Sequence, residues 1–269
     1  RKLFWLSIIS SKLQRFLLFN PYVVRKLNLP NNSNIPEKLQ FCMGTWKKIL
    51  TDYEFILWDF NRFDINSSNW VKQAFNAKKY AFAADYIRLY AVYNHGGVYL
   101  DMDVEVVKPF DELLNTELMI AFENDETKGI EAGCFGAEKG LPFIKKCLDY
   151  HNRNFVKPIV LPIIMRDILF DNFADKKYHV FPCEYFTAKD FVTGFIKKTE
   201  NTFAIHHYAG SWLSDKDRLN VTKRWDFYEN INNIGLRKLY KIVIKLTLKR
   251  IIGEKCWIKF KRIIALFGA

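Results

Sequence analysis

Two acidic residues in the middle of the chain have a spacing that suits metal chemistry. Asp101 and Asp103 are two residues apart in Val98–Val107, a segment whose pattern predicts a β-strand, so both carboxylates should lie on one side of it. Two adjacent carboxylates repel each other unless a cation lies between them, and such oxygen ligands suit Mg²⁺ or Mn²⁺. An ion of this kind typically binds the diphosphate of a nucleotide and neutralises the charge that develops when the diphosphate leaves.

A charged pair on the preceding segment is predicted to lie near these carboxylates. Residues 71–94 predict the longest helix of the chain, and the glycines after His95 predict its end. Asp85 and Arg88 are three residues apart and share a face close to that end. An isolated Asp-x-Asp is usually only an exposed acidic strand end. The hypothesis of a site therefore depends on the whole constellation of helix pair, glycine turn, apolar strand and paired acids.

The remaining periodicity predicts alternating helices and strands, which favours an α/β sandwich. The other predicted helices span 36–50 and 141–151, and the other predicted strands span 53–58, 118–122, 133–137, 178–182 and 202–208.

Composition and charge narrow the function classes. The 49% of hydrophobic residues excludes a disordered chain, and five cysteines without a CxxC pair disfavour a disulfide framework or a structural zinc site. Residues 1–30 carry a charge of +6 and residues 217–269 carry +9, whereas residues 31–216 carry −3. A nucleic-acid-binding protein would spread its positive charge over the folded domain, so no nucleic-acid partner is expected. Basic, apolar-rich ends favour an anionic membrane surface.

These patterns predict three parts of the chain. Residues 1–34 form a basic amphipathic N-terminal segment, either an interfacial helix or a segment that docks on the main core. Residues 35–216 form the catalytic domain. Residues 217–269 form a basic, amphipathic helical tail, for which membrane-surface binding is favoured over a solvated face of a packed helix.

The central motifs resemble those of a known enzyme family. The stretch Ala77–Leu114, AKKYAFAADYIRLYAVYNHGGVYLDMDVEVVKPFDELL, is similar to the signature of glycosyltransferase family 32, whose members carry a DXD sugar-binding region. The family includes initiating α-mannosyltransferases and bacterial capsule and lipopolysaccharide transferases. The similarity covers roughly residues 35–213 and ends in the motif His206-His207-Tyr208-Ala209-Gly210-Ser211-Trp212. It implies a GT-A fold, a Rossmann-like α/β/α domain, here with a basic helical C-terminal extension.

The resemblance also implies roles for the central charged residues. Asp101 and Asp103 would hold Mn²⁺ or Mg²⁺ and, through the ion, the donor diphosphate. Asp85 would bind hydroxyls of the donor sugar or ribose, and Arg88 would contact the sugar–phosphate part. Asp85, Arg88 and Asp103 are accordingly the predicted catalytic residues, and Asp85, Arg88 and Asp101 also bind the donor.

The late motif is expected to complete the site. The resemblance implies that His206 or His207 approaches the metal or the diphosphate, while Ser211 and Trp212 close over the phosphates of the donor. The alternatives are a strand partner and a packed imidazole for the two histidines, and core packing for Trp212. Family members usually begin with a strand that helps to bind the nucleotide base, and its place here holds the basic N-terminal segment. Residues 1–7 are the candidate for a diverged version of that strand.

The resulting hypothesis is a metal-dependent, retaining hexosyltransferase. It would move a sugar from a UDP- or GDP-sugar to a glycan or a lipid-linked oligosaccharide in bacterial surface polysaccharide biosynthesis. Its expected location is cytoplasmic, peripheral on the inner face of the plasma membrane. Two alternatives stay open. One is a non-catalytic, membrane-associated binder of glycans or nucleotides, and the other is a haloacid-dehalogenase-like phosphatase, whose opening motif also resembles Leu100–Val104.

Overall fold

The computed structural model describes residues 16–19, 35–58, 62–125, 128–152, 155, 158–176, 178–210 and 213–234. They fall into two compact units, the first built from residues 1–191 and 196–218 and the second from residues 192–195 and 219–269. The first unit contains every described residue of the predicted site.

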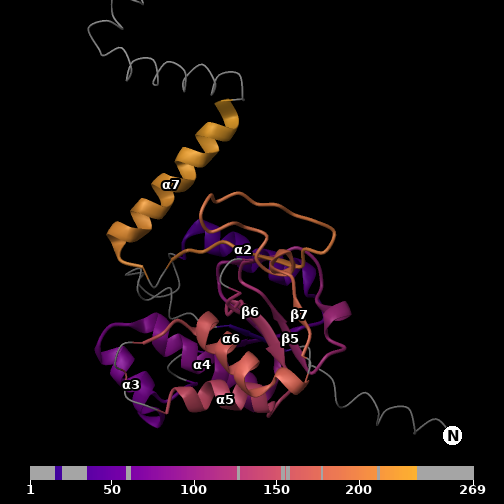
Figure 1. Cartoon of the computed structure of the whole chain (residues 1–269), viewed down its shortest axis with the longest axis vertical. Coiled ribbons are helices and arrows are strands. Elements are labelled where there is room, and N and C mark those ends of the chain that lie inside the picture. The colour runs from indigo at the N-terminus through magenta and orange to yellow at the C-terminus, as the bar shows by residue number, and fades with distance from the viewer. Residues whose placement is uncertain are drawn as a thin grey trace, which may run out of the picture. The chain divides into compact units, whose positions relative to one another are not determined.

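A six-stranded mixed sheet organises the first unit, with the strand order β2-β1-β3-β6-β5-β7. Three of its strands, β5, β6 and β7, are labelled in Figure 1. Its strands are β1 (Phe16–Phe19), β2 (Glu54–Leu57), β3 (Gly97–Leu100), β5 (Leu118–Ala121), β6 (Cys134–Ala137) and β7 (Val180–Phe181). Strand β3 is parallel to β1 and antiparallel to β6, and strands β3, β5 and β6 are buried throughout. A separate pair of antiparallel strands, β4 (Val104–Val106) and β8 (Ala204–His206), forms a second sheet.

Helices cover the main sheet and create two apolar cores. The larger core joins the sheet to helices α3 (Asn69–Asn76), α4 (Tyr80–His95), α5 (Pro142–Tyr150) and α6 (Leu161–Asn172). The second core joins helix α2 (Glu37–Ile49) to the small sheet and to alternate residues of β3 and β5. Successive side chains of a strand point to opposite faces, so Val98 and Leu100 belong to one core and Tyr99 to the other. The predicted α/β class and its α/β/α layering are confirmed.

Strand β1 supplies a parallel neighbour to both β2 and β3. Its residues pair with Glu54–Leu57 on one side and Val98–Leu100 on the other, so it fills the interior of the sheet. The N-terminal segment therefore contributes a strand at Phe16–Phe19, and the interfacial-helix alternative is wrong for these four residues. The proposed strand at residues 1–7 lies outside the described residues.

Two predicted elements are each divided in the structure. The expected helix over 71–94 is two helices, because Lys78 takes a left-handed backbone conformation with φ of 57° between α3 and α4. The expected strand over 98–107 is divided by a turn at residues 101–103, so β3 and β4 belong to different sheets. Helix α6 was not predicted; its sequence LPIIMRDILFDN begins with a proline-containing turn and buries Leu161, Ile164 and Met165.

The second unit contains helix α7 (Asp215–Ile234) from Leu219 onward. Gly194, with φ of 78°, lies so close to the Trp225 ring that a Cβ atom there would be 2.6 Å from it. Arg224 also donates to the backbone oxygen of Val192 at 2.8 Å. Helix α7 carries four basic and four acidic residues, so the positive surplus of the predicted tail comes from residues 235–269, which lie outside the described residues. None of the helices in the described part of the chain has the length and apolar character that are needed to span a membrane.

Candidate metal and donor site

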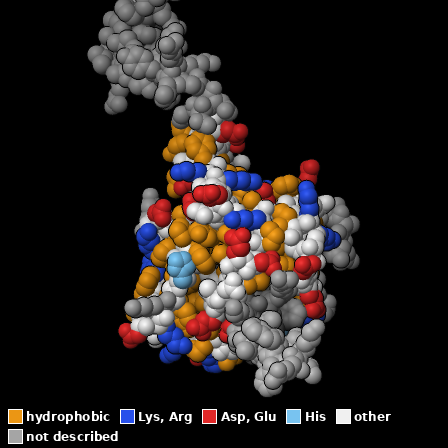
Figure 2. Space-filling model, turned by 90° about the vertical axis from the view of Figure 1, so that its right-hand side faces the viewer, with side chains coloured by type: hydrophobic (Ala, Val, Ile, Leu, Met, Phe, Trp, Pro, Cys, Tyr) orange, Lys and Arg blue, Asp and Glu red, His pale blue; other side chains and the backbone are white. Residues whose placement is uncertain are grey.

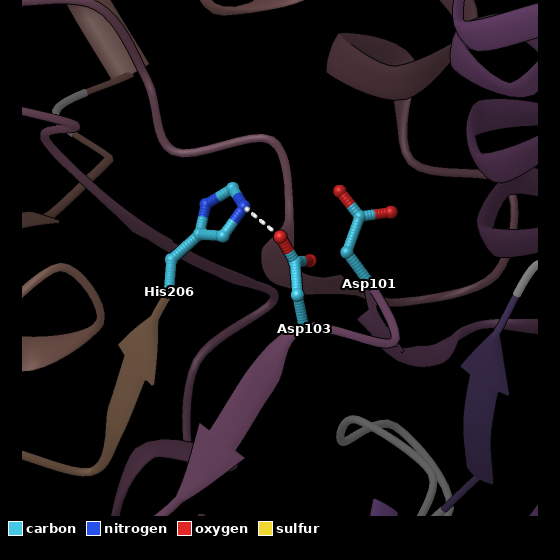
Figure 3. A group of neighbouring side chains, drawn as sticks. All are labelled: Asp101, Asp103 and His206. Carbon is cyan, nitrogen blue, oxygen red and sulfur yellow. Dashed lines mark ion pairs between the residues drawn. The ribbon is translucent and has the colours of Figure 1, made fainter. Parts of the chain in front are cut away.

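The Asp-x-Asp motif forms a turn that places both acids at one end of the main sheet. Asp101 follows β3 and Asp103 precedes β4, and the Val104 N–H donates to the backbone oxygen of Asp101 at 3.0 Å, which closes the turn. The expectation that strand alternation aligns the two carboxylates is wrong, because β3 ends at Leu100 and both acids lie in the turn before β4. The turn nevertheless brings the carboxylates together with the imidazole of His206 at the end of β8 (Figure 3). One ligand atom from each of these residues lies within 4.8 Å of the others.

Asp103 is held in place from two directions. The Ala209 N–H donates to its Oδ2 at 2.6 Å, and His206 Nε2 lies 3.5 Å from the same oxygen. Burial alone raises the pKa of Asp103, but the charge and hydrogen bond of His206, together with the Ala209 N–H, hold that pKa well below its usual range. Asp103 is therefore a carboxylate at neutral pH.

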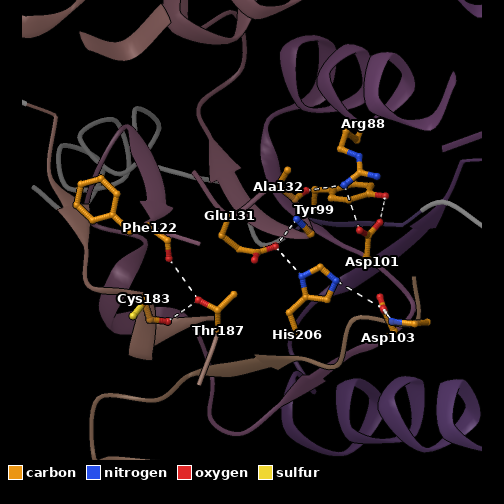
Figure 4. Close-up of polar contacts among 12 residues, drawn as sticks. Arg88, Tyr99, Asp101, Asp103, Phe122, Glu131, Ala132, Cys183, Thr187 and His206 are labelled. Atoms are coloured by element: carbon orange, nitrogen blue, oxygen red, sulfur yellow. Dashed lines mark hydrogen bonds and ion pairs between the residues drawn. The ribbon is translucent and has the colours of Figure 1, made fainter. Parts of the chain in front are cut away.

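Asp101 is held in place by Arg88, the cation of the predicted Asp85–Arg88 pair on α4, and by a tyrosine. Arg88 Nη1 lies 3.1 Å from Asp101 Oδ2, and Arg88 Nη2 lies 3.4 Å from Asp85 Oδ1. The Tyr99 hydroxyl donates to Asp101 Oδ1 at 2.6 Å, and the Arg88 guanidinium lies 4.8 Å from the centre of the Tyr99 ring. Arg88 also donates to the Ala132 carbonyl at 2.7 Å (Figure 4). The structure thus brings Asp85, Arg88 and Asp101 into one buried network.

The carboxyl group of Asp85 has a raised pKa in this network. Burial raises its pKa, Arg88 opposes this effect and the nearby Asp101 adds to it, and the resulting pKa is about 6. Carboxylates with displaced pKa values are common where a protein binds or transforms a ligand.

The two adjacent histidines have different partners. His206 lies between two carboxylates, with Nδ1 3.0 Å from Glu131 Oε1 and Nε2 facing Asp103. Burial lowers the pKa of His206, but Glu131 and Asp103 raise it well above its usual value. His207 instead directs Nε2 to Glu105 Oε2 at 2.9 Å, so its ring is not part of the cluster. Burial lowers the pKa of His207.

Several neighbours of the cluster were missed in the sequence. Glu131 is fully buried, and Tyr99 and Gly133 contact or adjoin the acids. A signal for Glu131 exists, since it is the only charged residue among the small and apolar residues of Gly129–Ala137. Ser211 and Trp212 lie outside the described residues, so their predicted closure over the phosphates stays a prediction.

Basic and acidic side chains are mixed on one face of the molecule (Figure 2). On the face displayed in Figure 2, basic and acidic side chains are interspersed among apolar ones across the described part of the chain. This mixture agrees with the small net charge of residues 31–216.

Comparisons with known proteins agree with the geometry. Residues 36–120 match the family described as a glycosyltransferase sugar-binding region containing a DXD motif. Inositol phosphoceramide mannosyltransferase 3 of Schizosaccharomyces pombe is 28% identical over 116 residues, which is 42% of this chain and 32% of the relative. Inositol phosphoceramide mannosyltransferase 1 of the same yeast is 27% identical over 137 residues, which is 47% of this chain and 43% of the relative. The chain therefore spans less than half the length of either relative.

A solved structure described as PaToxG glycosyltransferase aligns with 61% of this chain and 70% of its own, at 18% identity and a TM-score of 0.46. The predicted resemblance to DXD-containing glycosyltransferases is confirmed by the match to the family. Asp85, Arg88, Asp101 and Asp103 all lie within the matched residues. Residues 36–120 of this chain are thus similar to glycosyltransferase sugar-binding regions that contain a DXD motif.

Proposed function

We propose that the protein is a metal-dependent, retaining glycosyltransferase of the GT-A type. It transfers a hexose from a UDP- or GDP-sugar to a hydroxyl of a glycan or of a lipid-linked oligosaccharide. The convergence of Asp101, Asp103 and His206 within 4.8 Å, beside the Asp85–Arg88 pair, is the observation that carries this proposal.

The residues of the cluster fit a divalent cation. Two carboxylates and one imidazole offer hard oxygen donors and one nitrogen donor, a set that suits Mn²⁺ somewhat better than Mg²⁺. The hydrogen bonds from Tyr99 and Arg88 to Asp101 orient its carboxylate, and each carboxylate oxygen retains a second lone pair. A bound cation would supply positive charge to the diphosphate as that group leaves.

The protein's own groups then bind and orient the donor. Asp85 accepts hydrogen bonds from hydroxyls of the sugar or ribose, and Arg88 holds Asp85 and Asp101 at fixed positions while it contributes positive charge near the sugar–phosphate bond. Ser211 and Trp212 close over the phosphates. Catalysis rests on electrostatic stabilisation and on the alignment of donor and acceptor, and the acceptor attacks from the face that the diphosphate leaves.

The assay is donor hydrolysis and transfer with a panel of UDP- and GDP-hexoses, with and without Mn²⁺ or Mg²⁺. GDP-mannose is the first donor to test, because both yeast relatives are named mannosyltransferases. Asp101→Asn and Asp103→Asn should each abolish metal-dependent turnover, whereas Asp149→Asn, on the exposed side of α5, should not. Metal-dependent turnover that survives both site substitutions would exclude the proposal.

The same assay separates the alternatives. A non-catalytic binder would retain nucleotide affinity and release no sugar. A haloacid-dehalogenase-like phosphatase would release phosphate from a phosphoester with no sugar nucleotide present. Asp101 would then be the nucleophile, but both of its carboxylate oxygens accept hydrogen bonds, from Arg88 and from Tyr99, so the geometry favours a binding role.

We also propose that the protein acts on an anionic membrane surface, at the inner face of a bacterial plasma membrane, where surface polysaccharide is assembled. The +9 charge of residues 235–269 supports this location. Replacement of Lys241, Lys245 and Lys249 by glutamine in the full chain should reduce sedimentation with vesicles that contain phosphatidylglycerol. Equal sedimentation with neutral phosphatidylcholine vesicles would exclude an electrostatic contribution.

A further inference from the structure

A buried acid that was not among the predicted site residues contacts His206 of the cluster. Glu131 is 0% exposed, and its Oε1 accepts the Gly133 N–H and lies 3.0 Å from His206 Nδ1 (Figure 4). Its Oε2 is buried and has no hydrogen-bond partner in the part of the chain that the structure describes. A buried carboxylate with one unsatisfied oxygen is costly, so this position requires a physical reason.

The reason lies in the two nitrogens of His206. A neutral imidazole carries one proton, and the nitrogen without the proton is the one that can bind a metal. The Nδ1 proton is donated to Glu131 Oε1, and Nε2 faces Asp103, so a cation bound beside Asp103 would take the place of the Nε2 proton while the Nδ1 proton stays on the ring. The ring orientation is also restrained from its face, because Tyr208 stacks on it with ring centres 4.4 Å apart and an interplanar angle of 26°.

We propose that Glu131 is a positioning residue that fixes the tautomer and the orientation of His206, so that Nε2 completes a cation site with Asp101 and Asp103. This inference rests on the proposed function, because it requires the cation site. Carboxylates that hydrogen-bond the distal nitrogen of a metal-bound histidine commonly fix the ring and increase its basicity as a ligand. Glu131 does not itself contact the cation or the donor.

The neighbouring histidine provides a matched control. His207 Nε2 lies 2.9 Å from Glu105 Oε2, so a second carboxylate–imidazole pair exists one residue further along the chain. That imidazole lies outside the cluster. Substitution of Glu105 therefore removes a similar pair and a similar charge without changing the orientation of His206.

The experiment measures Mn²⁺ binding by the full chain, alone and with UDP or GDP, by electron paramagnetic resonance. Glu131→Ala should weaken Mn²⁺ binding by about ten- to hundred-fold, the usual effect of removing such a partner. Glu131→Gln should cause a smaller loss, because its amide oxygen still accepts a hydrogen bond from Nδ1. Glu105→Gln should bind Mn²⁺ like the wild type.

Electron spin-echo modulation from ¹⁴N provides a second readout. The wild type should show imidazole nitrogen bound to Mn²⁺, and His206→Ala should lose that signal, which assigns it. Glu131→Ala should lose or strongly weaken the signal at a Mn²⁺ concentration that saturates the site. Thermal unfolding without metal shows whether each variant is folded, and a purely structural role for Glu131 would change only this measurement.

The outcomes separate this inference from the proposed function. If the wild type and Glu105→Gln bind Mn²⁺ with a ¹⁴N signal and folded Glu131→Ala and Glu131→Gln do so equally well, the role of Glu131 is refuted and the cation site stands. If the wild type binds no Mn²⁺ with or without nucleotide, the cation site itself is refuted and the inference with it.

Discussion

Replacement of Asp85 by asparagine should stabilise the protein and impair the proposed sugar transfer. The side chain of Asp85 is only 14% exposed and lies near Asp101, and its pKa is raised from 3.8 to about 6. The folded state therefore binds the Asp85 proton more tightly than the unfolded state does. A shift of this size corresponds to about 3 kcal/mol of unfolding free energy.

The sign of the effect follows from proton linkage. The protonated form of Asp85 suits the folded state, so its contribution is fully favourable below pH 3.8 and is lost as the pH rises through about 6. Asp85→Asn resembles the protonated form at every pH. The variant should match the wild type near pH 4 and exceed its stability by up to about 3 kcal/mol at pH 7.5.

Urea unfolding of both proteins at several pH values measures the difference directly. Asp149→Asn, on an exposed turn of α5, is the control for a general charge effect and should show little change with pH. Sugar transfer by Asp85→Asn should fall, because an amide cannot replace a carboxylate that accepts hydrogen bonds from two hydroxyls. An Asp85→Asn protein less stable than the wild type at pH 7.5, or a difference that does not grow with pH, would refute the reasoning.

Three further substitutions test the buried network and the break between helices. Arg88→Met should destabilise the protein by about 3–5 kcal/mol in urea unfolding, because it leaves two carboxylates buried without a cation. Gly133→Ala should weaken Mn²⁺ binding and lower stability by about 1–3 kcal/mol, since a Cβ atom would lie 2.8 Å from both Glu131 Oε1 and His206 Cε1; unchanged binding would contradict the packing. Lys78→Gly should raise stability by about 1 kcal/mol in thermal or urea unfolding, because glycine adopts the positive φ without strain; Lys72→Gly, inside α3, should lower stability.

Local pattern predicted most of the fold and failed where the backbone departs from it. Strands such as Leu118–Ala121 were found because continuous apolar runs indicate buried strands. The break at Lys78 was missed because Ala77, Lys78 and Lys79 are ordinary helix formers, and no glycine or proline marks the left-handed residue. Strand β1 was missed because Phe16–Phe19 lies among lysines and arginines in a segment that resembles an amphipathic helix.

The acids of the candidate site could be predicted from the sequence, but the residues that hold these acids in place could not. Asp85, Arg88, Asp101 and Asp103 were identified because they lie close together in the sequence around one glycine turn. Glu131 and His206 reach the cluster from segments far along the chain, and spacing gives no information on such contacts. The choice between His206 and His207 depends on which carboxylate each ring faces, Glu131 for His206 and Glu105 for His207.

The connection between the two sheets explains why the acids must be so close in sequence. Asp101 directly follows β3 of the main sheet, Asp103 directly precedes β4 of the small sheet, and His206 ends β8, the partner of β4. A cation bound by all three would join the two sheets across one short turn, and each added residue in that turn would separate the ligands.

The formal charges of the cluster also favour a bound cation. Four carboxylates (Asp85, Asp101, Asp103 and Glu131) surround one guanidinium and one imidazole, so the cluster retains a negative excess that a divalent cation would offset. Burial is the main cause of the raised pKa of Asp85, and the neighbouring Asp101 carboxylate adds to it.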